Sequence, residues 1–193
     1  MITSQSLHSI LSSYGDAIEL NYKFSDSALE ELRALTTWED TINNKQAINF
    51  NGPIDVLGNN SKHKHDKGQE YNKNMYDCPT TKEFFDKFDS LARCRAFKLG
   101  KGSYFAPHRD AWKYHEQFRI VVFLNKTEID KWMFYLDDKF IQFKPGVPYI
   151  LNTRKVHGSF SFADDIYHII MSVFLTKENM DVIIDMLPNY NES

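Results

Sequence analysis

The spacing of apolar and polar positions along the chain changes near residue 93. Before this point, residues 27–35 and 80–91 carry apolar side chains at helical spacing. Each stretch opens with the pattern of a capping box, Ser27 with Glu30 and Thr80 with Glu83. The pattern predicts two amphipathic helices in an N-terminal half that otherwise consists of loops.

The segment between the two predicted helices, residues 51–74, is polar and rich in Gly, Asn and Lys. Long polar loops in compact domains usually have a function or are mobile. One hypothesis for residues 51–74 is therefore that they form a lid over a binding site.

After residue 93 the chain consists of short runs of aromatic and β-branched residues, which are typical of strands. These runs are residues 93–99, 118–124, 132–136, 140–143, 147–151 and 166–175. Asp137-Asp138 and Lys144-Pro145-Gly146 separate neighbouring runs and have the residue types of turns. A helical pattern over residues 177–187 follows the last run.

Helices followed by successive antiparallel strands predict an α+β, mainly β fold, a jelly roll of two sheets with flanking helices. We expect a single domain over residues 1–193. Residues 1–92 would form a helical and loop flank and residues 93–176 the β core with its site. Residues 177–193 would form a C-terminal helix and tail.

Composition narrows the class of protein. The chain has 42% hydrophobic and 15% aromatic residues, including 15 Phe and 10 Tyr, which favours a strand-rich core or an aromatic-lined cavity. Its formal charge of −3 lacks the basic excess of nucleic-acid-binding proteins, so no nucleic-acid partner is expected. No apolar run has the length that crossing a membrane requires.

The cysteines and the N-terminus bear on the cellular compartment. Cys78 and Cys94 are too few to form a disulfide scaffold in a chain of this length. The N-terminus has neither the basic segment nor the apolar segment of a secretion signal. Both observations predict a cytoplasmic protein with reduced thiols.

Three residues in the second half form a candidate metal site: His108 and Asp110 in Pro-His-Arg-Asp, and His157 in Val-His-Gly. Two imidazoles and one carboxylate cover one face of an octahedral ion and leave the opposite face for small molecules, as in non-haem Fe(II) oxygenases. On extended chain, positions i and i+2 project to the same side, so His108 and Asp110 can bind one ion. His157 follows far enough along the chain to return on another strand.

A simpler interpretation places these residues at the surface, since His-x-Asp triplets are common by chance. The order of the surrounding elements favours a metal site, because a strand, a glycine turn and a second strand precede His157. His63 and His65 alternate with lysines in the polar segment, and we interpret them as solvated side chains.

This half of the chain resembles the Fe(II)/2-oxoglutarate-dependent oxygenases, and most of all their aspartyl/asparaginyl β-hydroxylase-like branch. The resemblance covers about residues 104–174, and the first half of the chain contributes nothing to it. Its elements, in order, are Pro107-His108-Arg109-Asp110, residues 118–124, residues 146–152, Val156-His157 and Tyr167-His168-Ile169-Ile170.

The resemblance implies a distorted double-stranded β-helix in which His108, Asp110 and His157 bind Fe(II). In this family 2-oxoglutarate and O2 are co-substrates. The 2-oxoglutarate is decarboxylated to succinate and CO2, and a C–H bond of the substrate is hydroxylated. Related halogenases lack the carboxylate ligand, so the presence of Asp110 favours hydroxylation. The substrate would be an amino acid, a peptide or protein side chain, or a small metabolite.

The resemblance also suggests residues that bind the co-substrate. Arg119 lies eleven residues after His108, where similar proteins have an arginine that contacts 2-oxoglutarate. An arginine suits this role because its guanidinium binds carboxylates through two parallel hydrogen bonds. The arginine that the family usually has about ten residues after the distal histidine is absent, because position 167 is Tyr167. We therefore predict that further residues share this role with Arg119. The candidates are His168, Ser172, Arg154 and Tyr104.

Two other functions fit the same residues. A cupin-type isomerase or hydrolase would use Zn(II) or Mn(II) at a similar triad, because affinity alone does not select Fe(II). A non-catalytic binding module would keep the jelly roll without turnover, and the missing arginine favours this alternative. The complete set of His108, Asp110 and His157 favours an enzyme. The sequence leaves the substrate and the oligomeric state open.

Overall fold

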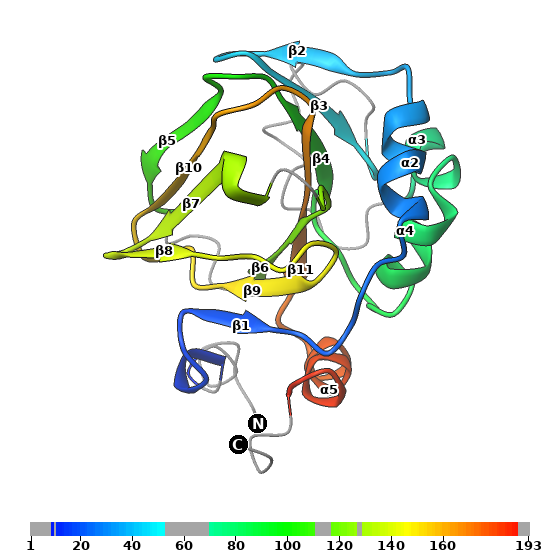
Figure 1. Cartoon of the computed structure of the whole chain (residues 1–193). Coiled ribbons are helices and arrows are strands. Elements are labelled where there is room, and N and C mark those ends of the chain that lie inside the picture. The colour runs from blue at the N-terminus through cyan, green and yellow to red at the C-terminus, as the bar shows by residue number, and fades with distance from the viewer. Residues whose placement is uncertain (1–8, 10, 53–69, 111–116, 127–128, 189–193) are drawn as a thin grey trace.

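Two antiparallel β-sheets face each other in the computed structural model, which describes residues 9, 11–52, 70–110, 117–126 and 129–188 (Figure 1). Within these residues the larger sheet has seven strands, in the spatial order β1 (Ala17–Glu19), β9 (Pro148–Leu151), β6 (Gln117–Phe123), β11 (Ile166–Phe174), β4 (Arg95–Leu99), β3 (Lys45–Asn49) and β2 (Glu39–Thr41). The smaller sheet has four, in the order β5 (Tyr104–His108), β10 (His157–Ser161), β7 (Trp132–Leu136) and β8 (Lys139–Ile141). The prediction of a mainly β jelly roll is confirmed.

Residues of the central strands alternate between two buried layers. In β6, Ile120 and Val122 belong to the core that includes the helices, whereas Val121 and Phe123 belong to the core between the two sheets. This alternation follows from the two-residue period of a strand. The larger sheet is covered on both faces, which explains why its central strands are nearly continuous apolar runs.

The helices cover the outer face of the larger sheet. Helices α2 (Ser27–Ala34), α3 (Lys73–Tyr76) and α4 (Pro79–Phe85) lie together on one side of the molecule, and α5 (Lys177–Asp185) lies near the two termini (Figure 1). A short 3-10 turn, Ile129–Lys131, precedes β7. Leu32 of α2, Phe84 of α4 and Ile183 of α5 are fully buried in the same core as Ile120. Their apolar faces therefore attach the helices to the sheet.

The starts of two helices differ from the capping-box prediction. Helix α4 begins one residue earlier than expected, at Pro79, where a proline loses no hydrogen bond. The carboxylate of Glu31 in α2 accepts hydrogen bonds from the backbone N–H groups of Thr80 and Thr81, at 3.0 and 3.4 Å. Helix α2 has Asp26 at its N-cap and no side-chain hydrogen bond there. A residue of the neighbouring helix thus caps α4 in place of a local side chain.

Residues 1–92, which we expected to form mostly helices and loops, also contribute β1, β2 and β3 to the larger sheet. Strand β3 pairs with β4 over five residues, from Lys45 with Leu99 to Asn49 with Arg95. These short strands have mixed residue types, so their position beside a longer strand determines them more than local propensity does. Most of the polar segment considered as a lid, residues 53–69 with His63 and His65, lies outside the described residues.

The turns expected between the later strands are present. Asp137 and Asp138 connect β7 with β8, and Asp137 has a φ of 60°, which Asp tolerates better than most residues. Gly146, before β9, has a φ of 74°, and a Cβ there would lie 3.0 Å from the carbonyl oxygen of Phe24. Glycine is favoured at this position both by its backbone conformation and by the close approach of the neighbouring segment.

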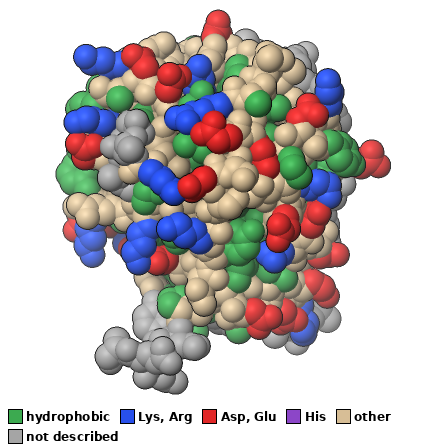
Figure 2. Space-filling view, turned by 45° about the vertical axis from the view of Figure 1, so that its right-hand side comes forward, with side chains coloured by type: hydrophobic (Ala, Val, Ile, Leu, Met, Phe, Trp, Pro, Cys, Tyr) green, Lys and Arg blue, Asp and Glu red, His purple; other side chains and the backbone are tan. Residues whose placement is uncertain are grey.

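The exterior carries charges of both signs. Figure 2 shows Lys and Arg side chains interspersed with Asp and Glu side chains over one face. None of the helices in the described part of the chain is long and apolar enough to cross a membrane. Cys78 and Cys94 are both buried free thiols, and burial raises the pKa of each to about 12. Both side chains are therefore protonated thiols at neutral pH.

Candidate metal centre

The two candidate histidine ligands lie opposite each other on neighbouring strands of the smaller sheet. His108 ends the edge strand β5, His157 begins β10, and the two residues are paired in the ladder. The register shifts before Ser159 pairs with Phe105, which indicates a β-bulge. Pro107 lies in this part of β5 and is tolerated because an edge strand has no partner on one side. A bulge changes the direction of nearby side chains, and here it accompanies the pairing of the two histidines.

Gly158, directly after His157, allows the strands to approach closely beside the site. A Cβ at this position would lie 2.6 Å from the carbonyl oxygen of Phe105 and 2.8 Å from the hydroxyl oxygen of Tyr135. Both distances are too short for a real Cβ, so a side chain here would push the neighbouring strand away. The glycine therefore helps to keep His157 opposite His108.

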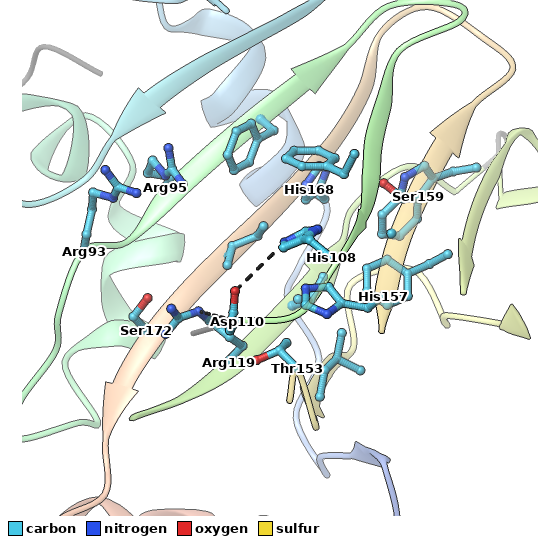
Figure 3. Close-up of a pocket in the computed structure, with 18 residues that line it drawn as sticks. Arg93, Arg95, His108, Asp110, Arg119, Thr153, His157, Ser159, His168 and Ser172 are labelled. Carbon is cyan, nitrogen blue, oxygen red and sulfur yellow. Dashed lines mark ion pairs between the residues drawn. The ribbon is translucent and has the colours of Figure 1, made fainter. Parts of the chain in front are cut away.

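Asp110 reaches the same place from just beyond the end of β5. Its backbone N–H donates to the carbonyl oxygen of Thr153 at 2.9 Å, which attaches this segment to the connection between β9 and β10. One donor atom from each of His108, Asp110 and His157 lies within 4.8 Å of the other two (Figure 3). The structure thus brings together the three residues that the sequence pattern selects.

Hydrogen bonds to the backbone orient both imidazoles. Nδ1 of His108 lies 2.8 Å from the carbonyl oxygen of Ala106, and Nδ1 of His157 lies 3.0 Å from that of Lys155. A carbonyl oxygen only accepts, so each Nδ1 carries a proton, and in the neutral ring Nε2 then keeps the lone pair. Burial lowers the pKa of His157, which favours the neutral ring that a metal ion requires.

Arg119 holds the carboxylate of Asp110. Its Nε lies 3.3 Å from Oδ2 of Asp110, and its Nη1 donates to Oε1 of Gln117 at 3.2 Å. The other carboxylate oxygen, Oδ1, lies 4.0 Å from Nε2 of His108. One oxygen of Asp110 is therefore paired with the arginine, and the other faces the histidine nitrogen. Such outer partners orient the ligands of metal sites.

The three donors line a cavity of about 200 Å³ between the two sheets (Figure 3). The wall formed by the larger sheet and the segment before β4 carries polar and cationic side chains. These are Arg93, Arg95, Arg119, His168 and Ser172. Among the described residues that line the cavity, Asp110 supplies the one carboxylate, so the three arginines leave an excess of positive charge. A cavity of this charge attracts anionic ligands.

A column of stacked groups forms part of the cavity wall. The guanidinium of Arg95 lies 4.9 Å from the ring centroid of Phe97. Phe97 stacks on His168, His168 on Trp132, and Trp132 on Phe123, with centroid distances of 5.1, 5.2 and 4.9 Å. The interplanar angles are 14°, 22° and 7°. Each ring is held between its neighbours, so the column restricts the motion of Arg95 at its end.

His168 is a neutral residue in this column. Burial, together with the charges of Arg95 and Lys45, lowers the pKa of His168 from 6.5 to about 3. Nδ1 of His168 and Nε1 of Trp132 are buried and have no hydrogen-bond partner among the residues the structure describes. The imidazole therefore contributes no positive charge to the cavity at neutral pH.

We expect stability to decrease with falling pH because of His168. Its pKa is lower in the folded state, so the unfolded chain binds more protons between about pH 6.5 and 3. The contribution of His168 to the free energy of unfolding is complete above the pKa that this residue has in the unfolded chain. Within the window it decreases by about 1.4 kcal/mol for each pH unit that the pH falls. Urea unfolding between about pH 7 and 4.5 should show a flatter dependence for His168→Phe, which keeps the stacked ring. Parallel curves for the two proteins would contradict this prediction.

Three of the predicted co-substrate residues line the cavity with the donors: Arg119, His168 and Ser172. Tyr104 and Arg154 are not among the described residues that line it, and Tyr104 is exposed on β5. Strand geometry explains why His168 and Ser172 line the cavity. Alternate residues of β11 face it, so these two side chains point inward, whereas Tyr167, one position before His168, packs on the helix side of the sheet.

Two residues that line the cavity, Arg93 and Arg95, were not predicted from the sequence as site residues. Both belong to the run of residues 93–99, which was predicted as a strand. Arg93, Arg95 and Phe97 occupy alternate positions, so they could have been placed on one face. The sequence pattern did not indicate that this face looks toward the metal donors, because that depends on which strands pair with β4.

The fold is that of solved oxygenase structures. The chain is similar to a prolyl hydroxylase from Trichoplax adhaerens in complex with a hypoxia inducible factor peptide fragment, with a TM-score of 0.58, 11% identity and 92% of each chain covered. It is also similar to a 2OG-Fe(II) oxygenase family oxidoreductase from Burkholderia pseudomallei, with a TM-score of 0.57, 12% identity, and 90% of this chain and 91% of that chain covered.

A third similar structure is the viral collagen prolyl hydroxylase of Paramecium Bursaria Chlorella virus-1 in its 2OG complex. The TM-score is 0.50, with 12% identity, and 84% of this chain and 97% of that chain are covered. At these identities the similarity concerns the fold alone. No family model and no curated protein matches the sequence.

Proposed function

We propose that this protein is an Fe(II)- and 2-oxoglutarate-dependent dioxygenase that hydroxylates a C–H bond. The convergence of His108, Asp110 and His157 in one cavity carries the proposal. Two imidazole nitrogens and one carboxylate oxygen are the donor set of non-haem Fe(II) oxygenases. The fold, which is that of 2OG-Fe(II) oxygenase structures, supports the same reaction class. The sequence motifs resemble the aspartyl/asparaginyl β-hydroxylase-like branch most.

The proposed substrate is an amino acid, a peptide or protein side chain, or a small metabolite. The Trichoplax enzyme is in complex with a peptide fragment, and the viral enzyme is in complex with 2OG. These two ligand classes are compatible with a cavity that has an excess of arginine over carboxylate.

The residues of the chain have separate tasks in this proposal. When bound, Fe(II), 2-oxoglutarate and O2 would together supply the oxidant for hydroxylating an unactivated C–H bond. The ion would be held by Nε2 of His108, Nε2 of His157 and Oδ1 of Asp110. Arg119 keeps the carboxylate of Asp110 in place through its 3.3 Å contact. The buried ring of Trp132 helps to exclude water from the inner part of the cavity.

Anaerobic reconstitution tests the proposal. Adding Fe(II) and 2-oxoglutarate to the apo-protein should produce the weak visible charge-transfer band of a 2-oxo acid on ferrous iron. Admitting O2 should then yield succinate. Asp110→Ala removes the anionic ligand and should abolish both signals. Asp181→Ala is the matched control, because this carboxylate is 58% exposed on α5 and pairs with Lys177.

Two results would contradict the dioxygenase. One is the absence of the band in the wild-type protein together with tight binding of Zn(II), which would favour a cupin-type metalloenzyme. The other is an unchanged band in Asp110→Ala, which would exclude this carboxylate from the metal site.

A further inference from the structure

Arg95 is a cationic side chain that lines the cavity. It lies in β4, lines the same cavity as the metal donors, and makes no ion pair with any residue that the structure describes. Two like charges, Arg93 and Arg119, line the cavity with it. Partly buried cations that repel each other lower the stability of the folded protein unless an anion compensates them. The cavity is therefore built to receive a negative group at Arg95.

The guanidinium of Arg95 is also held in position before any ligand arrives. It stacks on Phe97, and Phe97 is fixed by His168 and Trp132 behind it. A side chain that is already ordered loses little conformational entropy when it binds a ligand. Its planar fork can form two parallel hydrogen bonds with a carboxylate.

Three other basic side chains on this side of the protein are less suited to the task. Arg119 is occupied by Asp110 and Gln117. Lys45 is buried, and its Nζ donates to the carbonyl oxygen of Tyr104 at 2.7 Å. The imidazole of His168 is neutral and is stacked on both faces.

The pairing of the strands brings Arg95 to the part of the cavity that β11 also lines. Arg95 is paired with Ile170, and its neighbour on the same face, Phe97, is paired with His168. Adjacent strands lie about 4.8 Å apart, so β4 can supply a cation beside the cavity-facing residues of β11.

We propose that Arg95 binds the distal carboxylate of the co-substrate and thereby selects a 2-oxo acid with two carboxylates. This inference rests on the proposed function, which places the 2-oxo acid group at the metal. It replaces the expectation from the sequence that Arg119, His168, Ser172, Arg154 and Tyr104 provide the anchor. Arg119 instead positions Asp110.

Two co-substrates that differ only in the distal group test the proposal. 2-Oxoglutarate and 2-oxopentanoate have the same carbon chain, but 2-oxopentanoate ends in a methyl group. Their dissociation constants are measured by anaerobic titration of the Fe(II)-loaded protein, followed by the charge-transfer band and by calorimetry. Wild type should bind 2-oxoglutarate roughly 30- to 1,000-fold more tightly, as expected for a charge pair that loses one partner.

In Arg95→Gln this preference should disappear, because the affinity for 2-oxoglutarate falls while that for 2-oxopentanoate stays the same. Arg95→Lys keeps the charge and most of the buried stem, so it provides a second variant if the first does not fold. It should lose at least about 10-fold of the preference, because Lys offers a point charge without a planar fork. Arg93→Gln, at the third arginine of the cavity, should keep more of the preference than Arg95→Gln does. Arg33→Gln, at an exposed arginine of α2 that pairs with Glu30, is the control and should keep the full preference.

A preference that survives in Arg95→Gln, or that falls further in Arg93→Gln than in Arg95→Gln, would overturn the assignment of Arg95 while leaving the dioxygenase intact. If Fe(II)-loaded wild type binds neither 2-oxo acid, the proposed function itself fails. The two failures are therefore distinguishable.

Discussion

Replacing His157 with alanine is expected to lower the affinity for Fe(II) by more than about 100-fold and to abolish succinate formation. Removing only a partner that orients a metal ligand typically costs 10- to 100-fold in affinity, so removing a ligand should cost more. His157 is suited to this test because it is buried, neutral and oriented by the carbonyl oxygen of Lys155. Anaerobic competition between the protein and a chelator for Fe(II) measures the effect.

The matched control for this variant is His168→Phe. His168 is also a buried histidine that lines the cavity, but it is not one of the converging donors. Its replacement by an aromatic ring should leave the affinity for Fe(II) within about threefold of wild type, since no ligand is lost. Circular dichroism of both variants verifies that they are folded. Equal affinities in His157→Ala and wild type would rule out His157 as a ligand.

Phe84→Ala is expected to cost about 3–5 kcal/mol of the free energy of unfolding. The ring of Phe84 is fully buried and packs against Tyr22, Phe24 and Phe88, with centroid distances of 4.6, 5.0 and 5.5 Å. Its removal leaves a cavity between α4 and the N-terminal segment. The free energy of unfolding of a domain is only about 5–15 kcal/mol, so this variant should lose a large fraction of its stability. Chemical denaturation followed by tryptophan fluorescence gives the difference.

Phe140→Ala provides the comparison for Phe84→Ala. Phe140 lies in β8 and is 66% exposed, so its truncation removes little buried surface and should change stability by at most about 0.5 kcal/mol. A similar loss in both variants would mean that burial in the core around α4 does not explain the effect of Phe84.

The metal ligands and the strands could be predicted because the pattern that indicates each of them involves residues that are close together in the sequence. His108 and Asp110 could be paired because positions i and i+2 share one side of extended chain. The strand at residues 132–136 was predicted with its observed bounds, since its apolar run is bordered by turn residues. The helix starts were less accurate, because the cap of α4 comes from Glu31 on another helix.

Other features depend on contacts between distant segments. Strands β1, β2 and β3 have little sequence signal of their own. Pairing of β1 with β9, of β3 with β4 and of β2 with β3 determines them. The role of Arg119 depends on its contact with Asp110. The position of Arg95 in the cavity depends on which strand lies beside β4 and on the side to which its alternate residues point.

The sequence by itself determined the candidate donor set of His108, Asp110 and His157 and the strand-rich character of residues 93–176. These features follow from residue type and from the two periods of helix and strand, both of which are local. Only the tertiary structure decided which cations share the cavity and which oxygen of Asp110 faces His108 rather than Arg119. Strand order and register bring together residues that are far apart in the chain, and no local pattern encodes those distances.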